Sequence, residues 1–377
     1  MLPLSLREFH QALKARFTSV NEAEAVADYG DVPAEHRALR ETAGVLDLSF
    51  RSRLCLTGAD RIRFLHGQVT NDIKALQPGE GCYAALVTAK GRLESDLNVY
   101  NLAEELLLDF EPGLCKRVSE RLEKFIVADD VQVVDVSPHY GLLSVQGPAA
   151  AEAVKALGLF AQLPAKPSSF VSLADPTLGE LYLVNQPRFG MSGFDLFVPV
   201  AALGAVADKL IAAVSTAGGR ACGWEAMEAA RIEAGVPRFG VDMDESNLPQ
   251  EAGIEARAVS YSKGCYIGQE VLNRLHTLGH VNRELRGLRL PPAVKELPAK
   301  GDKLFHAGKE VGYITSATRS PALGEIFALG YVRKEANQPG TELLVQTSAA
   351  KTPVTVVAVP VPGGLSRQEA QETQKQK

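Results

Sequence analysis

Cysteine is scarce in this chain of 377 residues, and the five that occur are widely spread (Cys55, Cys82, Cys115, Cys222 and Cys265). Their number is odd, and no two of them have the spacing of a CxxC motif. The set therefore indicates neither a disulfide framework nor a zinc knuckle. Scattered free cysteines are typical of a reducing compartment, so we expect a cytoplasmic protein.

Long apolar runs and an excess of positive charge are also lacking. No run approaches the roughly 18 apolar residues of a transmembrane helix, and the N-terminus carries acid and base too early for a signal peptide. The 45 acidic residues outnumber the 40 basic ones, which gives a net charge of −5. Nucleic-acid binding needs a concentrated basic face, so we expect no direct nucleic-acid partner. Because long apolar runs are lacking, we also expect no membrane partner.

The common phosphate-binding and catalytic signatures are missing as well. There is no P-loop, no GxGxxG joins a strand to a helix, and no nucleophile elbow marks Ser/His/Asp catalysis. His276 and His280 are four apart and could form a metal site with Cys265. Gly279 interrupts the helix that would align them, and no further ligand completes the set, so no metal site is predicted.

The first forty residues are predicted to contain one helix and a long connection. A single helical face is formed by four apolar residues (Leu6, Phe9, Leu13 and Phe17). This helix is expected to dock on the rest of the protein. Residues 21–36 are polar and contain Gly and Pro, so they are expected to form a surface connection.

Strands and helices then alternate up to about residue 283, whereas only strands are predicted after it. Residues 83–87 and 93–100 flank a Lys-Gly turn in which Gly91 can take positive φ, which is a hairpin signature. Two longer helices are predicted (residues 200–216 and 224–233). After about residue 283, Gly, Pro and short apolar runs indicate a small all-β domain, either a barrel or a jelly roll.

The most informative segment is residues 263–270, with the sequence KGCYIGQE. Apolar spacing beyond it predicts a helix with Gln269 and Glu270 in its first turn, so Cys265 lies in a glycine-flanked loop that enters this helix. Lys263 and the positive end of the helix both favour a thiolate, the reactive form of cysteine. The alternative is a buried cysteine in a tight turn, and the motif alone does not name a reaction.

Arg231 and Glu233 lie at the end of an alanine-rich helix. Residues two apart point to different sides of a helix, so the two side chains need separate partners. Arg231 could hold an anionic or carbonyl group of a ligand, and Glu233 could hold a protonated ring nitrogen. The alternative is a helix-end pair that is solvated or bound to neighbouring backbone.

Several stretches resemble the aminomethyltransferase (T-protein) of glycine cleavage. They are residues 43–49, 70–72, 78–79, the hairpin at Gly91 and residues 231–235. Residues 263–270 resemble the signature of a paralogous group, the YgfZ/Iba57 family of folate-binding iron–sulfur proteins. The similarity runs from about residue 35 to residue 362. Only the cysteine motif is specific to the YgfZ branch, whereas the other stretches are shared with T-proteins.

The resemblance implies an α+β fold of three domains, T-protein-like, with a central folate cavity and a C-terminal β-barrel. Residues 1–282 would form the folate-binding region, built of two interleaved α+β subdomains. Residues 283–362 would form the barrel, and the polar residues 363–377 would form a disordered tail.

The resemblance also implies which residues contact folate. The T-protein has paired aspartates after its hairpin, and here the matching pair is Ser95 and Asp96. Its folate loop is shortened here to residues 190–195, where Asp195 stands in for a pterin-binding glutamate. The folate-contact candidates are Arg231, Asp96, Asp195, Asn71 and Glu233, and the catalytic candidates are Cys265 and Lys263.

From the YgfZ-like motif we expect a protein that binds tetrahydrofolate and supports assembly or repair of 4Fe–4S enzymes, including tRNA-modifying ones. Folate and iron–sulfur client proteins are the expected partners. Ser95 and the shortened loop weigh against genuine aminomethyl transfer. Three alternatives stay open: a folate-dependent aminomethyltransferase, a folate-independent cysteine enzyme, and a scaffold with a vestigial cavity.

Overall fold

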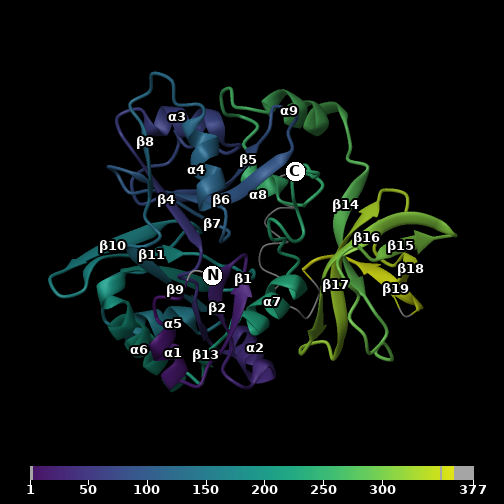
Figure 1. The fold of residues 1–377 in the computed structure, drawn as a ribbon, viewed down its shortest axis with the longest axis horizontal. Helices are drawn as coiled ribbons and strands as arrows, with labels where there is room; N and C mark the ends of the chain where they lie inside the picture. The colour runs from purple at the N-terminus through teal and green to yellow at the C-terminus, as the bar shows by residue number, and fades with distance from the viewer. Residues whose placement is uncertain (1–2, 349, 361–377) are drawn as a thin grey trace.

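The computed structural model describes residues 3–348 and 350–360. Figure 1 shows an upper lobe around one sheet, a lower lobe around a second sheet, and a barrel at the right. The predicted α+β fold of three domains with a C-terminal barrel is therefore confirmed. The predicted disordered tail, residues 363–377, lies outside the described residues.

The upper lobe is built on a five-stranded sheet of order β5-β6-β7-β4-β8. Its strands are β4 (Ser52–Thr57), β5 (Gly81–Val87), β6 (Leu93–Asn101), β7 (Leu106–Phe110) and β8 (Gln132–Asp135). Helices α3 (Arg61–Gln68) and α4 (Cys115–Glu123) pack on one face, where Leu54 and Leu108 are buried. Because side chains alternate along a strand, Cys55 and Leu107 face the other way, toward the lower lobe.

The lower lobe is built on a six-stranded sheet of order β10-β11-β12-β9-β3-β13. Its strands are β3 (Gly44–Asp47), β9 (Tyr140–Gln146), β10 (Phe170–Asp175), β11 (Gly179–Asn185), β12 (Gly193–Pro199) and β13 (Arg220–Ala221). Helices α5 (Ala150–Ala156) and α6 (Val200–Thr216) cover one face. On the other face Leu142 and Phe197 join Leu107 of the upper lobe in one apolar cluster, and we call this contact between the lobes the seam.

The N-terminal elements pack beside the lower sheet. They are α1 (Arg7–Ala12), the two-stranded sheet of β1 (Arg16–Val20) and β2 (Ala23–Asp28), and α2 (Val32–Glu41). Helix α7 (Trp224–Glu233) contacts α2 and β2 on one side and the barrel on the other. The short helices α8 (Glu255–Ala258) and α9 (Gln269–Leu278) lie at the upper lobe (Figure 1).

The C-terminal barrel is closed, with strand order β14-β17-β16-β15-β18-β19. Its strands are β14 (Arg283–Arg289), β15 (Lys303–His306), β16 (Lys309–Ser320), β17 (Glu325–Arg333), β18 (Glu342–Gln346) and β19 (Lys351–Val357). Inward-facing aliphatic residues such as Leu288, Ile314 and Val345 fill the interior. The interior is therefore a packed core, as expected for a small barrel filled by its own side chains.

Two predictions near the N-terminus are wrong. The first helix ends at Ala12, and Phe17 belongs to strand β1, because the chain reverses after Leu13 through Lys14 at φ 60°. Residues 21–36 are not a surface connection but contain β2, every residue of which is buried, and the start of α2. The polar side chains of β2 misled the prediction, since Asp28 is buried in an ion pair with Arg16.

The hairpin and the two longer helices are confirmed. Strands β5 and β6 pair antiparallel around Gly91, which has φ +72°. Helices α6 and α7 have the predicted bounds. The helix after the cysteine loop begins at Gln269, and Gly268 precedes it with φ +85°.

Candidate functional site

The hairpin of β5 and β6 positions Asp96 beside Tyr83. Asp96 pairs with Ala85 in the ladder, so its side chain lies near that of Tyr83, two residues along β5. The Tyr83 hydroxyl donates to Asp96 Oδ2 over 2.7 Å. The other carboxylate oxygen, Oδ1, is buried and has no hydrogen-bond partner among the described residues. A buried acceptor without a partner is costly and therefore marks a place where a ligand can bind.

The surroundings of Asp96 change its acidity. Burial raises the pKa of Asp96 to about 6, and the nearby carboxylate of Glu111 acts in the same direction. The Tyr83 hydrogen bond and the Arg51 guanidinium oppose the rise in pKa without cancelling it. A carboxyl group with a pKa near neutrality can both give and take a proton, as a general acid or base must.

Asn71 and Lys263 lie in the same region as Asp96. The Asn71 side-chain amide donates to the carbonyl oxygens of Tyr83 (2.8 Å) and Arg257 (3.0 Å). Lys263 Nζ donates to the carbonyl oxygen of Asn71 over 2.8 Å. Of the seven candidates, Asp96 and Asn71 therefore both contact Tyr83, and Lys263 joins them only through the carbonyl oxygen of Asn71. Arg257 lies over the Tyr83 ring at 5.0 Å.

Lys263 is turned into the protein rather than toward solvent. Besides Asn71, its ammonium group donates to the carbonyl oxygens of His66 (2.5 Å) and Val69 (2.8 Å). Burial lowers the pKa of Lys263 to about 8. These three hydrogen bonds attach the loop 263–268 to the end of α3 and the residues after it. In this structure Lys263 therefore stabilises the position of the loop.

Cys265 is exposed, so the alternative of a buried cysteine is wrong. His66, which no sequence pattern pointed to, lies beside the loop: its Nε2 is 3.8 Å from the point where a Cβ on Gly264 would be. His66 Nδ1 lies 3.3 Å from Asp72 Oδ1. Burial and the nearby Lys263 lower the pKa of His66, so its imidazole is neutral at neutral pH. No sequence spacing could link His66 to Cys265, because about two hundred residues separate them.

Arg231 and Glu233 have separate partners, as their spacing predicted. Arg231 is 2% exposed and donates to the carboxylates of Glu228 and Asp242. Glu233 is 1% exposed and meets a ring nitrogen of the protein itself, His36 Nε2, at 3.0 Å. Both side chains are therefore satisfied within the chain, and their roles as folate contacts stay predictions.

Asp195 is fully buried on β12 and is held by Arg188. Two parallel hydrogen bonds join them, from Arg188 Nε over 3.1 Å and from Nη2 over 2.6 Å. Burial raises the pKa of Asp195, although the Arg188 cation opposes this. Both carboxylate oxygens have a partner, so Asp195 differs from Asp96 in having no free acceptor.

Arginines and acids alternate through the middle of the molecule. Arg51 contacts Asp109 (2.9 Å) and Glu111 (3.0 Å), and Arg238 joins Glu111 (3.0 Å) to Glu228 (3.1 Å). We call the whole set the ion-pair network: Arg188, Asp195, Asp109, Arg51, Glu111, Arg238, Glu228, Arg231 and Asp242. It links the Asp96 region to α7 and the barrel. The sequence analysis named only Arg231 and Asp195 from this set, because the other members are isolated charges on separate elements and loops that share no sequence motif.

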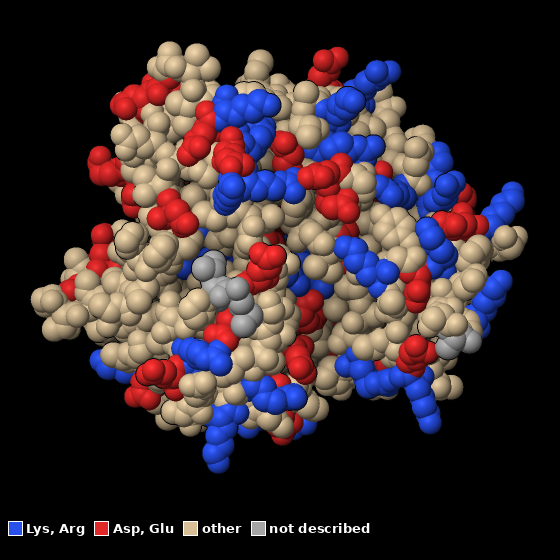
Figure 2. All heavy atoms as spheres, viewed as in Figure 1, with Lys and Arg blue, Asp and Glu red and all other residues tan. Residues whose placement is uncertain are grey.

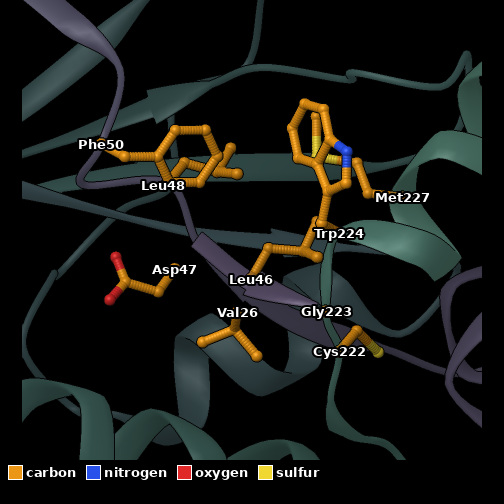
Figure 3. A pocket seen from close by; sticks show the side chains of 9 residues that line it. All are labelled: Val26, Leu46, Asp47, Leu48, Phe50, Cys222, Gly223, Trp224 and Met227. Carbon is orange, nitrogen blue, oxygen red and sulfur yellow. The ribbon is translucent and has the colours of Figure 1, made fainter. Parts of the chain in front are cut away.

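A small pocket lies between β3 and α7 (Figure 3). It has a volume of about 10 Å³, which is room for one water at most. Trp224 packs edge-on against Phe50 there, with ring centroids 5.6 Å apart. The Asp47 carboxylate is engaged by His10 over 2.8 Å, so this pocket offers little to a ligand.

Three further observations bear on possible partners. Figure 2 shows Lys and Arg interspersed with Asp and Glu over the visible face. Within residues 3–348 and 350–360, no cluster of three or more His, Cys, Asp or Glu residues is placed to hold a metal ion. His280 instead meets Lys334, and His276 stacks on Tyr261 with ring centroids 3.8 Å apart. None of the described helices has the length and hydropathy needed to cross a bilayer.

Comparisons with known proteins identify the family. Residues 6–263 match the GCVT N-terminal domain, and residues 283–361 match the glycine cleavage T-protein C-terminal barrel domain. The chain belongs to the glycine cleavage T-protein family. A protein of Nostoc sp. named aminomethyltransferase is 30% identical over 92% of this chain and 92% of its own length. A Bacillus subtilis protein of the same name is 30% identical over 88% and 92%.

A solved structure has the same fold. The glycine cleavage system aminomethyltransferase T from Bartonella henselae has a TM-score of 0.85 to this chain at 24% sequence identity. The match covers 97% of this chain and 99% of that one. The similarity therefore extends through both lobes and the barrel.

These relatives correct two expectations. The predicted role in iron–sulfur protein maintenance, with its client proteins, is wrong, because the relatives matched over about nine tenths of the chain are named aminomethyltransferases. The expectation that the chain is not a genuine aminomethyltransferase is overturned by the same finding. Ser95 does not argue against the activity, because its side chain is fully buried. Asp96 keeps its carboxylate beside Tyr83.

Proposed function

We propose that this protein is a folate-dependent aminomethyltransferase in which Asp96 is the acid–base group. Family membership supports the reaction class, and the Asp96 carboxyl supports the assignment of the residue. Its pKa near 6 and its unpartnered Oδ1 are the observations that carry the proposal. Tetrahydrofolate, when bound, supplies the amine nitrogens that take up the one-carbon unit.

The residues around Asp96 have distinct tasks in this proposal. Asp96 Oδ1 takes a proton from, or returns it to, the reacting amine. Tyr83 fixes the orientation of the carboxylate through its bond to Oδ2. Asn71 holds the backbone of Tyr83, and Lys263 holds Asn71 in turn. Preorganised groups of this kind lower the barrier because they need no rearrangement during the reaction.

For the other predicted folate contacts, the structure gives less support. Arg231, Asp195 and Glu233 are bound within the protein, so direct contact with folate requires them to change partners. We propose that they mainly shape the ion-pair network. The resemblance of residues 263–270 to the YgfZ signature stays a prediction, as does the cytoplasmic location. The division at residue 282 also stays a proposal, supported by the extents of the two domain matches.

The test supplies an aminomethylated lipoyl carrier protein together with tetrahydrofolate and follows the formation of methylene-tetrahydrofolate. Turnover that depends on both substrates is the expected result. Calorimetric titration with tetrahydrofolate alone, in the same buffer, checks binding separately. A protein that binds tetrahydrofolate but forms no product would contradict the transferase proposal, and absence of binding would also contradict the folate site.

A second candidate function is suggested by His66. His66 Nε2 lies 3.8 Å from the Cβ position of Gly264, the residue before Cys265, and His66 Nδ1 lies 3.3 Å from Asp72 Oδ1. A histidine close to a cysteine loop can serve as the base that activates a thiol. This favours a cysteine enzyme as the second candidate. Alkylation of Cys265 should then slow in His66→Gln. Equal alkylation rates in the two proteins across the pH range would remove this candidate.

A further inference from the structure

Glu111 follows strand β7 directly and lies across the upper sheet from Asp96. Asn98 of β6 pairs with Asp109 of β7, and the Asn98 side-chain amide donates to Asp109 over 3.2 Å. Continuing this register by two residues places Glu111 opposite Asp96, with both side chains on the face that carries Asn98 and Asp109. The proposed acid–base group therefore has a second carboxylate as its cross-strand neighbour.

Glu111 is held from two directions. Arg51, which precedes β4, donates from Nη1 to Glu111 Oε1 over 3.0 Å. Arg238 donates to the other oxygen, Oε2, from Nε over 3.1 Å and from Nη2 over 3.0 Å. Burial raises the pKa of Glu111, but the Arg238 and Arg51 cations outweigh burial and lower the pKa below its ordinary value. Glu111 therefore stays ionised at neutral pH.

The two acids thus have unequal surroundings. The Asp96 carboxylate accepts from the neutral Tyr83 hydroxyl of β5. Burial raises the pKa of Asp96 most, the charge of Glu111 adds to the rise, and Tyr83 and the Arg51 cation oppose it. Like charges on opposite residues of neighbouring strands repel each other. Because Glu111 is fixed as an anion, Asp96 is the member of the pair that takes up the proton.

Arg238 belongs to the loop after α7, and the barrel fixes the position of that loop. The Arg238 backbone N–H donates to Asp242 Oδ2 over 3.1 Å. Asp242 Oδ1 accepts from the hydroxyls of Thr315 and Ser316 on β16, each over 2.6 Å. The Arg238 guanidinium also lies over the Trp224 ring, 4.4 Å from its centroid. The clamp on Glu111 therefore depends on how the barrel is seated.

We propose that Glu111 is a positioning residue that controls proton exchange at Asp96, and that Arg238 links this control to the barrel. The inference rests on the proposed function, in which Asp96 is the acid–base group. With Arg238 in place, much of the negative charge of Glu111 is compensated. Withdrawal of Arg238 would strengthen the negative field at Asp96 and so raise the pH at which Asp96 releases its proton.

Two substitutions separate these roles without leaving a buried charge alone. In Glu111→Gln, Arg51 keeps Asp109 and Arg238 keeps Glu228. In Arg238→Gln, Glu111 keeps Arg51. Both variants should therefore fold, because Glu111 and the two arginines each retain a partner of opposite charge.

The test is carboxyl-carbon NMR of the full-length protein with isotope-labelled aspartate, followed across pH, with Asp96→Asn to assign the signal. The wild-type midpoint should lie near pH 6. Glu111→Gln should lower the midpoint by about one pH unit, and Arg238→Gln should raise it, because the first removes a negative charge and the second a positive one. Glu152→Gln, at an exposed position of α5, is the matched control and should leave the midpoint unchanged.

The direction of the shift in Arg238→Gln decides between coupling and simple loosening of the fold. A loosened fold admits water to Asp96 and lowers the midpoint in both variants. A downward or absent shift in Arg238→Gln therefore overturns the link to the barrel. An unchanged midpoint in Glu111→Gln overturns the positioning role of Glu111.

The titration requires no turnover, so its failure is distinguishable from failure of the proposed function. The pH–rate profiles of methylene-tetrahydrofolate formation should move with the same signs as the NMR midpoints. Rate profiles that stay in place while the midpoints shift would contradict the role of Asp96 in the reaction. Midpoints shifted as expected in a protein that forms no product would contradict the transferase reaction and support the coupling between the two acids.

Discussion

Two aspartates on facing sheets of this protein, Asp195 fully buried and Asp96 half-buried, have opposite surroundings. Asp195, on β12 of the lower lobe, is saturated by two hydrogen bonds from Arg188. Asp96, on β6 of the upper lobe, has a neutral tyrosine on one oxygen and no partner on the other. Burial raises the pKa of both, but only Asp195 has a cation directly bonded to it.

These different surroundings indicate that Asp195 is a structural carboxylate, whereas Asp96 can exchange protons with a ligand. A carboxylate held by arginine stays ionised and fixed, so it contributes to packing and charge balance. A carboxylate that is buried beside a neutral donor and another acid keeps a pKa near neutrality, so it can exchange protons. We therefore expect Asp96 of the upper lobe to take part in catalysis and Asp195 of the lower lobe to stabilise the fold.

The largest expected effect is on catalysis through Asp96. Asp96→Asn should lower the turnover rate by about 10²–10⁴-fold, the usual contribution of a general acid or base. Single-turnover formation of methylene-tetrahydrofolate measures it. Glu94→Gln is the matched control, because Glu94 lies two residues along β6 and pairs with Arg121 instead. A rate loss of similar size in the control would remove the special role of Asp96.

Asp195→Asn should show the reverse pattern. Removing one member of a buried pair leaves Arg188 with only Asp109, at 3.6 Å, so the free energy of unfolding should fall by about 3 kcal/mol. The turnover rate of the folded protein should change little. Denaturant unfolding and turnover are measured on the same preparation. Weaker folate binding with unchanged stability would instead show that Asp195 contacts the ligand.

The stability of the protein should depend on pH through Asp96. Its folded pKa of about 6 lies above the ordinary 3.8, so the unfolded chain ionises first as pH rises. The free energy of unfolding therefore falls between about pH 4 and pH 6 and stays low above that range. The loss should be about 1–3 kcal/mol. Urea titrations of the wild type and Asp96→Asn check this, since the variant should lack this step.

Tyr83→Phe should have the smallest effect. Loss of one hydrogen bond is worth about 1 kcal/mol, so turnover should fall by severalfold. The Tyr83 bond lowers the pKa of Asp96, so the variant should also shift the pH dependence of the rate upward. The pH–rate profiles of the two proteins show both changes. A profile that moves downward would mean that Tyr83 does not stabilise the ionised carboxylate.

The sequence predicted local features well and long-range charge pairing poorly. The turn at Gly91, the helix after residue 268 and the barrel follow from local propensity and periodicity, and all are present. Asp96 was found through the resemblance to T-proteins. Its partner Tyr83 lies on the neighbouring strand β5, and no sequence motif identified it.

Arg231 pairs with Glu228 one helical turn earlier and with Asp242 in the loop after α7. The partner of Glu233 is His36 of the distant helix α2, so only the folded chain could show that contact.

The acid–base role of Asp96 is tested most directly by the pH dependence of single-turnover methylene-tetrahydrofolate formation in the wild type, with Asp96→Asn as the baseline. We expect a rate difference that titrates near pH 6, the pKa of Asp96. A wild-type profile that runs parallel to that of the variant across this range would contradict it.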